Sequence, residues 1–300
     1  MNVTAQNLTG TKALPIPTLP NIVIIGAAKA GTGSLHYYLS KHPEIFMSEI
    51  KELNFFDRPE RPGRDLNWYK TQFDGNYRFN GESSPQYTRF PRTPGVAKRI
   101  KKTCSNPKLI YMLRDPVDRV VSHYVENLTR WRESRSFETV VANIENEKQE
   151  FIECSSYHLQ LSQYLKHFSQ DDIHIVILER LSKNPKAELK RVFRFLGVDE
   201  NFWSPDFDVR KNEGESKRVP RAFFMAITPR FIRRQTFDVT WMPWSVAQML
   251  NKLVRIGAPP PGKPKLSEKD DLRLQAILKS DVEALRAYLK DPLPEWRPYA

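Results

Sequence analysis

The feature that most constrains this chain is a short apolar run that leads directly into a glycine-rich turn. The segment Asn21–Ile25 is β-branched and almost wholly apolar, which is typical of a buried parallel strand. The turn Gly26-Ala-Ala-Lys-Ala-Gly-Thr-Gly-Ser34 follows it. Leu35, Tyr38 and Leu39 then repeat at helical spacing. We therefore predict a strand, a tight turn and a helix in direct succession.

Two further predicted strands are each followed at once by a helix. The buried run Lys108–Leu113 precedes Asp115, a favoured N-cap residue with a proline after it. The run Ile173–Leu178 precedes a helix that Asn184 caps and Gly197 ends. Strands that alternate with helices predict the fold class: α/β, with a P-loop-like central parallel β-sheet flanked by helices in a single domain.

The rest of the chain is divided by composition. Residues 1–20 are polar and contain three prolines, so we predict a flexible leader there and a domain over 21–300. Within that domain we predict, in chain order, helices over 136–150 and 155–168, an irregular basic and aromatic stretch over 203–265, and an amphipathic C-terminal helix over 267–290.

The charge balance points to anionic partners. Lysine and arginine number 47 against 35 aspartates and glutamates, which gives a net charge of +12. Such an excess favours a phosphorylated cofactor, a polyanionic glycan, nucleic acid or a membrane surface, and does not choose among them.

The cysteines and the apolar runs limit the cellular compartment that we expect. Cys104 and Cys154 are too few for a disulfide framework or a four-thiolate metal site, so we expect two reduced thiols, with one disulfide as the alternative. No apolar run reaches the roughly 20 residues that span a bilayer, and no signal peptide is visible. We expect a cytoplasmic protein; a Golgi-lumen domain without its anchor is the alternative, and peripheral membrane contact stays open.

The glycine-rich turn has the composition of an anion site. Its glycines let backbone N–H groups converge at a helix N-terminus, where the helix dipole adds positive potential. A full positive charge and two hydroxyl donors accompany them, on Lys29, Thr32 and Ser34. A small, flexible turn without a ligand is the plain alternative.

The same turn departs from the motif of ATP-binding P-loops. That motif requires a lysine directly after its second conserved glycine. Gly26 and Gly31 have the required spacing, but Thr32 follows, and the lysine lies inside the loop at Lys29. A P-loop-like phosphotransferase or kinase therefore stays the second hypothesis, and the absence of G-x-G-x-x-G disfavours a dinucleotide fold.

A second anion contact is expected at Arg114. It follows the second predicted strand, and open α/β sheets bind ligands beyond the carboxyl ends of their strands. Two separate anion contacts on neighbouring strand ends suggest a nucleotide phosphorylated at both ends. A local ion pair of Arg114 with Asp115 is the alternative.

Four ordered segments resemble the sulfotransferase family, which uses 3′-phosphoadenosine 5′-phosphosulfate (PAPS). The similar branch contains the heparan sulfate sulfotransferases and bacterial carbohydrate sulfotransferases. The resemblance covers about residues 21–200 and returns from Asp281 to Trp296. The segments are Gly26–Ser34, Lys51–Asp57, Gly81–Tyr87 and Leu113–Tyr124.

This resemblance implies how the donor is bound. Arg114 and Ser122 match the pair that binds the 3′-phosphate, and Tyr157 resembles a tyrosine near the nucleotide. Lys217 and Arg218 match a late basic contact. The 5′-phosphosulfate falls to the loop residues Lys29, Ala30, Gly31, Thr32, Gly33 and Ser34. The product would be 3′-phosphoadenosine 5′-phosphate (PAP).

The resemblance also implies the catalytic residues. Glu52 matches the general base, and Lys29 matches the lysine that stabilises the leaving phosphate. His123 and His36 are the alternative bases. Sulfuryl transfer passes through a loose in-line transition state, for which positioning and charge neutralisation suffice, and we expect no metal.

The expected acceptor carries a hydroxyl group, with carbohydrate as the implied class. The chain departs from the heparan-modifying enzymes at Ser83, where they commonly carry lysine, and this argues against heparan sulfate itself. A third hypothesis is a non-catalytic basic module that binds nucleic acid or another polyanion. The ordered motifs weigh against it, so no nucleic-acid partner is expected.

Overall fold

The fold is built on a five-stranded, all-parallel sheet. A computed structural model describes residues 18–58, 60–130, 132–147, 149–208 and 262–299. The strand order is β2-β3-β1-β4-β5, and every neighbouring pair is parallel. The predicted fold class is confirmed. The strands are β1 (Ile22–Gly26), β2 (Ile45–Met47), β3 (Phe79–Ser83), β4 (Lys108–Leu113) and β5 (Ile173–Ile177).

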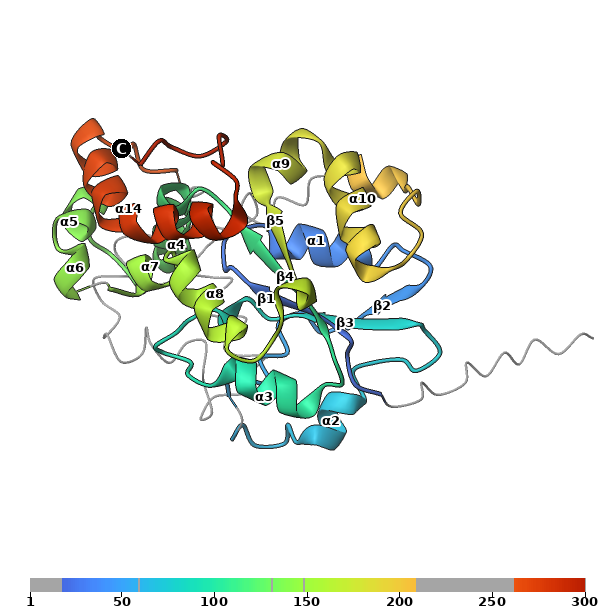
Figure 1. Cartoon of the computed structure of the whole chain (residues 1–300). Helices are drawn as coiled ribbons and strands as arrows, with labels where there is room; N and C mark the ends of the chain where they lie inside the picture. The colour runs from blue at the N-terminus through green and yellow to red at the C-terminus, as the bar shows by residue number, and fades with distance from the viewer. Residues whose placement is uncertain (1–17, 59, 131, 148, 209–261, 300) are drawn as a thin grey trace, which may run out of the picture.

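Helices cover both faces of this sheet. In Figure 1, α4, α7, α8 and α14 gather on one side, whereas α1, α9 and α10 lie on the other. The helices are α1 (Thr32–Leu39), α2 (Leu66–Lys70), α3 (Val96–Thr103), α4 (Pro116–Thr129), α5 (Phe137–Ala142), α6 (Ile144–Glu147), α7 (Gln149–Glu153), α8 (Tyr157–Leu165), α9 (Leu178–Lys183), α10 (Pro185–Leu196) and α14 (Glu268–Leu289), with short 3₁₀ turns η1 (Pro85–Tyr87), η2 (Gln170–Asp172) and η3 (Pro205–Asp208).

The predicted helix boundaries follow from capping chemistry. Asp115, Asn184 and Ser267 each accept a hydrogen bond from the backbone amide three residues on, at 3.1 Å in every case. Gly197 ends α10 with a left-handed φ of 75°, which costs glycine nothing. These caps fix where α4, α10 and α14 begin and where α10 stops.

The structure differs from the prediction in several places, and helices α2 and α3 are not among the predicted elements. Strands β2 and β3 were not predicted, because β2 has three residues and β3 reads Phe-Asn-Gly-Glu-Ser. The predicted helix over 136–150 is divided into α5, α6 and part of α7, and Leu178 begins α9 instead of ending β5. The predicted helix over 155–168 is the shorter α8.

Both cysteines are buried, and Cys104 belongs to the hydrophobic core. Cys104 and Cys154 are buried and unpaired, so the expectation of two free thiols is confirmed. Among the helices that the structure describes, none has the length and apolar composition needed to cross a membrane. Most of the predicted leader over 1–20 and of the irregular stretch over 203–265 falls outside the described residues.

Candidate active site

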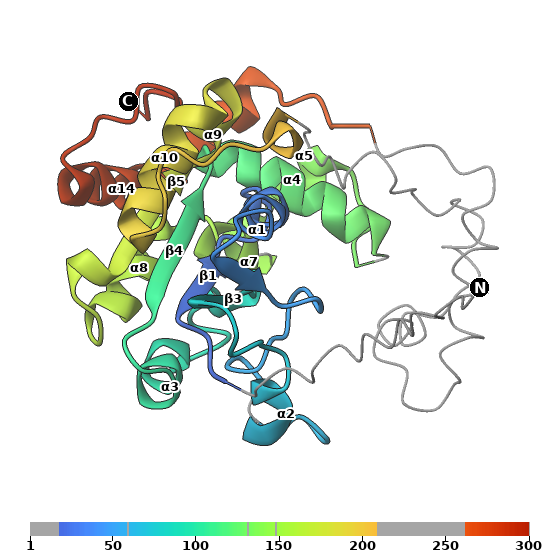
Figure 2. The ribbon, with the colours of Figure 1, turned by 90° about the vertical axis from the view of Figure 1, so that its right-hand side faces the viewer.

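The four motif segments meet at one edge of the sheet. All strands are parallel, so their carboxyl ends lie together; in Figure 2, β4 leads from the α3 end of the molecule to the α9 end. The glycine-rich loop after β1 is tied to β4 by the Ala27 amide, which donates to the Met112 carbonyl at 2.7 Å. The loop after β2 is tied to β3 by the Glu52 amide, which donates to the Ser83 carbonyl at 3.1 Å.

The glycine-rich loop presents the open N-terminus of α1. Gly31 is the N-cap residue, with a left-handed φ of 86°, and has no side chain that could cap the helix. A Cβ at this position would lie 2.7 Å from Leu178 Cδ1 and would displace the end of that side chain, while the left-handed φ itself favours glycine. The first amides of α1, from Thr32 and Gly33, lack intrahelical acceptors. Such amides are well suited to binding an anion. Ala30 and Thr32 are buried, while Gly33 and Ser34 are half-buried.

Lys29 extends from this loop to α4. Its Nζ lies 2.8 Å from Glu126 Oε2, and Glu126 is also paired with Arg130. Its φ of 75° is left-handed, which costs a non-glycine residue of order 1–3 kcal/mol and is typical of functional sites. Lys29 therefore combines a strained backbone with a half-buried ammonium group, in the loop that leads into the first turn of α1.

One face of α4 connects Lys29 with Arg114. Asp118, Ser122 and Glu126 recur every four residues, so they share a helix face. The Arg114 guanidinium lies 3.5 Å from Asp118 at one end of this stripe, and Lys29 contacts Glu126 at the other. Eight residues of helix correspond to about 12 Å along the axis. The structure thus brings two predicted cationic residues to one surface, with Ser122 between them.

A buried arginine beneath the loop was not singled out from the sequence. Arg119 is fully buried; its Nε donates to Ser155 Oγ at 2.7 Å and its Nη1 donates to the Ala28 carbonyl at 3.3 Å. It thereby braces the loop and adds positive potential beneath it. The sequence offers no signal for this role, because an arginine on a helix is ordinarily solvated.

His123 is held as a neutral ring by the same arginine. Its Nδ1 lies 2.9 Å from Arg119 Nη2, and the ring packs against Phe151 with centroids 4.5 Å apart. Burial, and then the charge of Arg119, lower the pKa of His123 well below its ordinary value. A base with a depressed pKa in a fixed contact is better suited to bracing the loop than to taking a proton from an acceptor.

This contact predicts acid sensitivity that depends on His123. As pH falls below 6.5, His123 becomes protonated in the unfolded chain before it does in the folded chain. The stabilising contribution of the neutral His123 ring is therefore present above pH 6.5 and is lost as pH falls. We expect the free energy of unfolding of the wild type to decrease by about 1.4 kcal/mol more than that of His123→Asn between pH 7.5 and pH 5.5. Urea unfolding at the two pH values measures this difference. Parallel pH profiles would contradict it.

Tyr157 lies beside Arg114 and is fully buried. Burial raises the pKa of Tyr157, while the positive charges of Arg119 and Arg114 oppose that shift. Its ring lies 6.0 Å from Tyr111 and 5.9 Å from Trp296, between centroids. Within the described ranges its hydroxyl has no hydrogen-bond partner, and a buried donor in that state fits an oxygen-rich ligand near Arg114.

The chain's C-terminal tail reaches the same end of α4. The resemblance in the tail extends only to Trp296 and does not include Arg297. Arg297 Nη2 lies 3.0 Å from Asp118 Oδ1, so Asp118 is shared by Arg114 and Arg297. Trp296 Nε1 donates to Glu179 Oε2 at 3.2 Å. Figure 1 shows this tail running between α14 and α9. It orders the surroundings of Arg114.

Glu52 occupies a strained position in the loop after β2. It is half-buried and has a left-handed φ of 60°, and Asn54 has a φ of 50°. Ser83, over which this loop lies, is fully buried, and in the described part of the chain its Oγ has no hydrogen-bond partner. Glu52 thus lies on an anchored backbone at the carboxyl edge of the sheet.

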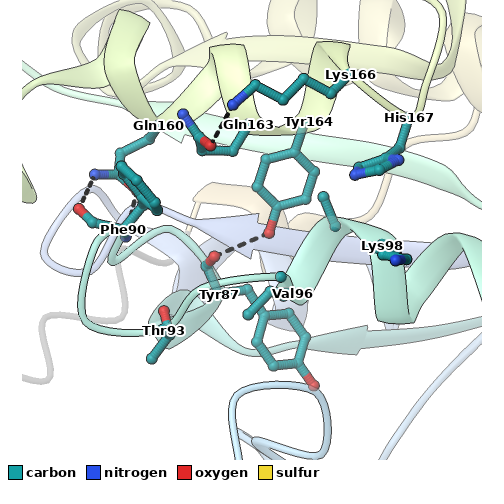
Figure 3. Close-up of a pocket in the computed structure, with 12 residues that line it drawn as sticks. Tyr87, Phe90, Thr93, Val96, Lys98, Gln160, Gln163, Tyr164, Lys166 and His167 are labelled. Atoms are coloured by element: carbon teal, nitrogen blue, oxygen red, sulfur yellow. Dashed lines mark hydrogen bonds between the residues drawn. The ribbon is translucent and has the colours of Figure 1, made fainter.

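Two of the predicted site residues cannot be placed in the structure. Lys217 and Arg218 fall outside the described residues. In the described ranges, no group of three or more histidine, cysteine, aspartate or glutamate side chains could hold a metal ion. A cavity of about 60 Å³ between α8 and residues 87–98 contains none of the predicted site residues (Figure 3).

Comparison with known sequences gives a consistent family. A profile described as "Sulfotransferase domain" matches residues 19–212. Human heparan sulfate glucosamine 3-O-sulfotransferase 5 is 31% identical over 193 residues, covering 61% of this chain and 55% of that protein. Mouse heparan sulfate glucosamine 3-O-sulfotransferase 3A1 is 30% identical over 221 residues, covering 70% of this chain and 55% of that protein. The chain therefore matches just over half the length of these relatives.

A solved structure matches nearly the whole fold. The sulfotransferase from Alicyclobacillus acidocaldarius superimposes with a TM-score of 0.65 at 26% sequence identity, covering 93% of this chain and 98% of that chain. The match extends beyond the 19–212 region and therefore takes in the C-terminal part of the chain as well.

Proposed function

We propose, from the premise that this chain belongs to the sulfotransferase domain family, that it transfers the sulfuryl group of PAPS to an acceptor hydroxyl. The observation that carries the proposal is the surface of α4 to which Lys29 and Arg114 are both brought, about 12 Å apart along the helix axis. A donor with phosphate groups on both sides of its adenosine matches two separated cations better than ATP does. The P-loop-like phosphotransferase is the alternative.

The donor's two ends would be bound by different elements. The open amides of α1 and residues Lys29–Ser34 would hold the 5′-phosphosulfate, with the buried Arg119 adding positive charge below. Arg114 and Ser122 would hold the 3′-phosphate. Tyr157, whose buried hydroxyl is unpartnered within the described residues, would donate to the same end of the nucleotide.

The chemistry requires charge neutralisation and one proton acceptor. In a loose in-line displacement, negative charge grows on the oxygen between sulfur and the leaving phosphate, where the Lys29 ammonium would neutralise it. To do so Lys29 exchanges its contact with Glu126 for the donor. Glu52 would accept the proton of the attacking hydroxyl, and no step requires a metal.

The acceptor class is proposed from the relatives. Those curated relatives are named for sulfation of glucosamine in heparan sulfate, and we extend only the carbohydrate class to this chain. Ser83 has a neutral hydroxyl and is fully buried, so this position offers no charge to an acceptor of the heparan type. A neutral or differently charged carbohydrate is the acceptor that we propose.

The experiment that tests the function is a transfer assay with isotope-labelled PAPS. Mass spectrometry of oligosaccharide, lipid and small-molecule hydroxyl acceptors should show label in a carbohydrate product. Calorimetry should show binding of PAP without metal and little binding of ATP with magnesium. The reverse preference would favour the phosphotransferase instead.

The assignment of Arg114 predicts selective loss of nucleotide binding. Arg114→Ala should raise the Kd of PAP by about 10- to 100-fold and that of adenosine 5′-phosphate by less than about threefold, because only PAP has a 3′-phosphate. Calorimetry measures both constants. Arg78→Ala removes an arginine that is paired with Glu44 and directly precedes β3, at the end of the sheet opposite the carboxyl edge, and it serves as the control. Equal losses for the two nucleotides would remove Arg114 from this role.

A further inference from the structure

Below the Glu52 loop lies a buried carboxyl group that the mechanism does not use. Glu82, on β3, is completely buried and accepts three hydroxyl donors: Tyr69 at 2.5 Å, Ser84 at 2.7 Å and Tyr87 at 2.9 Å. Burial raises the pKa of Glu82, and the three donors oppose that shift. Such a fully satisfied polar cluster fixes the groups around it.

Two of these hydroxyls also hold the backbone of the Glu52 loop. Ser84 Oγ accepts from the Asn54 amide at 3.0 Å. The Tyr87 hydroxyl accepts from the amides of Phe55 at 3.0 Å and Phe56 at 3.3 Å. An amide can only donate, and a hydroxyl has a single proton. Ser84 and Tyr87 must therefore direct their protons to Glu82, which accepts at both of its oxygens, as an ionised carboxylate does.

The loop needs such anchors because it is strained. Glu52 and Asn54 both have left-handed φ angles, and such conformations persist only where the surroundings determine them. The Glu52 amide is bound to Ser83 on one side, and the hydroxyl contacts begin at Asn54 on the other. Tyr87 is itself fixed at its carbonyl, which accepts from the Tyr164 hydroxyl at 3.0 Å (Figure 3).

We propose that Glu82 is a positioning residue for Glu52: it directs the hydroxyl protons of Ser84 and Tyr87 toward itself, so that their oxygens anchor the amides of residues 54–56. This inference rests on the proposed function, in which Glu52 is the general base. Tyr69 belongs to the same cluster, but within the described part of the chain its hydroxyl contacts Glu82 and no amide of the Glu52 loop, so the two tyrosines provide a matched pair.

The test compares Tyr87→Phe with Tyr69→Phe. Each change deletes one buried hydroxyl that donates to Glu82 and keeps the ring. In Tyr87→Phe, hydrogen exchange of the Phe55 and Phe56 amides should become at least about tenfold faster. Its kcat should fall about 10- to 100-fold with the Kd of PAP unchanged, as expected when a catalytic group is misplaced. Tyr69→Phe should leave that exchange at the wild-type rate and lower kcat by less than about threefold.

A third variant addresses the carboxylate itself. Glu82→Gln replaces one of the two accepting oxygens by an NH₂ group, which would turn the proton of either Ser84 or Tyr87 back toward the loop, so exchange should become faster at Asn54 in the first case or at Phe55 and Phe56 in the second. The proposal is overturned if exchange at 55 and 56 is the same in Tyr87→Phe and Tyr69→Phe, or if both lose kcat equally. A wild type that transfers no sulfuryl group, with faster exchange only in Tyr87→Phe, would refute the proposed function and support the anchoring of the loop.

Discussion

Replacing Glu52 with glutamine should lower kcat by about 10²- to 10⁴-fold, the contribution expected of a positioned general base. Glutamine has nearly the same shape, but it cannot take the proton of an attacking hydroxyl. The loop backbone should be unaffected, because its anchors are the Glu52 amide on Ser83 and the amides that follow it. The Kd of PAP should change by less than about twofold, since the donor contacts that we propose lie on the glycine-rich loop, at Arg114, and on α4 and α8.

Steady-state rates with labelled PAPS, and calorimetry with PAP, measure the two quantities separately. Glu49→Gln is the matched control, because Glu49 is exposed and lies three residues before Glu52 in the same loop. It should keep kcat within about twofold of the wild type. A Glu52→Gln variant with wild-type turnover would move the base elsewhere, and the neutral His123 ring would then be the next candidate.

Much of the fold followed from patterns with direct physical meaning. The apolar run before the glycine-rich turn, the caps at Asp115, Asn184 and Ser267, and the stop at Gly197 all act within a few residues of the chain. Local rules of this kind can be read without knowledge of tertiary contacts. The expected sulfotransferase family is confirmed by the matching family profile.

What could not be predicted depends on partners far apart in the sequence. Strand β3 has polar residues because Glu82 is satisfied by Tyr69, Ser84 and Tyr87, and a pattern of apolar residues cannot reveal such a strand. Arg119 is buried because Ser155 and the Ala28 carbonyl accept its protons. In both cases the sequence shows a charged residue that would ordinarily be solvated, and only the fold supplies the partners.

The contacts of the C-terminal tail near Arg114 also depend on partners that are far apart in the sequence. Arg297 contacts Asp115, Asp118 and Asp271, which lie on or next to two different helices. Arg297 and Arg114 share Asp118, so Arg297 neutralises part of the negative charge of this carboxylate. The Arg114 guanidinium, which lies 3.5 Å from Asp118, is then more available to an incoming anion. The sequence alone suggested a local ion pair of Arg114 with Asp115, whereas the structure places the Arg114 guanidinium beside Asp118.

Replacing Lys29 with methionine should also cause a large loss, of about 10²- to 10³-fold in kcat, because the charge that grows on the leaving phosphate would lose its neutralising partner. Methionine keeps most of the side chain's length, and both residues are non-glycine, so the strain of the left-handed position is unchanged. Single-turnover rates with saturating PAPS measure the chemical step.

A control variant separates the effect of the Lys29 charge from that of a lysine at the other end of α1. Lys41, just beyond the end of α1, is paired with Asp206 at 3.2 Å, and Lys41→Met should keep kcat within about twofold. If Lys29 acts on the transition state, Lys29→Met loses kcat more than it weakens PAP binding, since PAP lacks the reacting sulfuryl group. A variant that only raises the Kd of the nucleotide and keeps kcat would show instead that Lys29 binds the donor without assisting its cleavage, and that charge at the leaving phosphate is neutralised by the amides of α1.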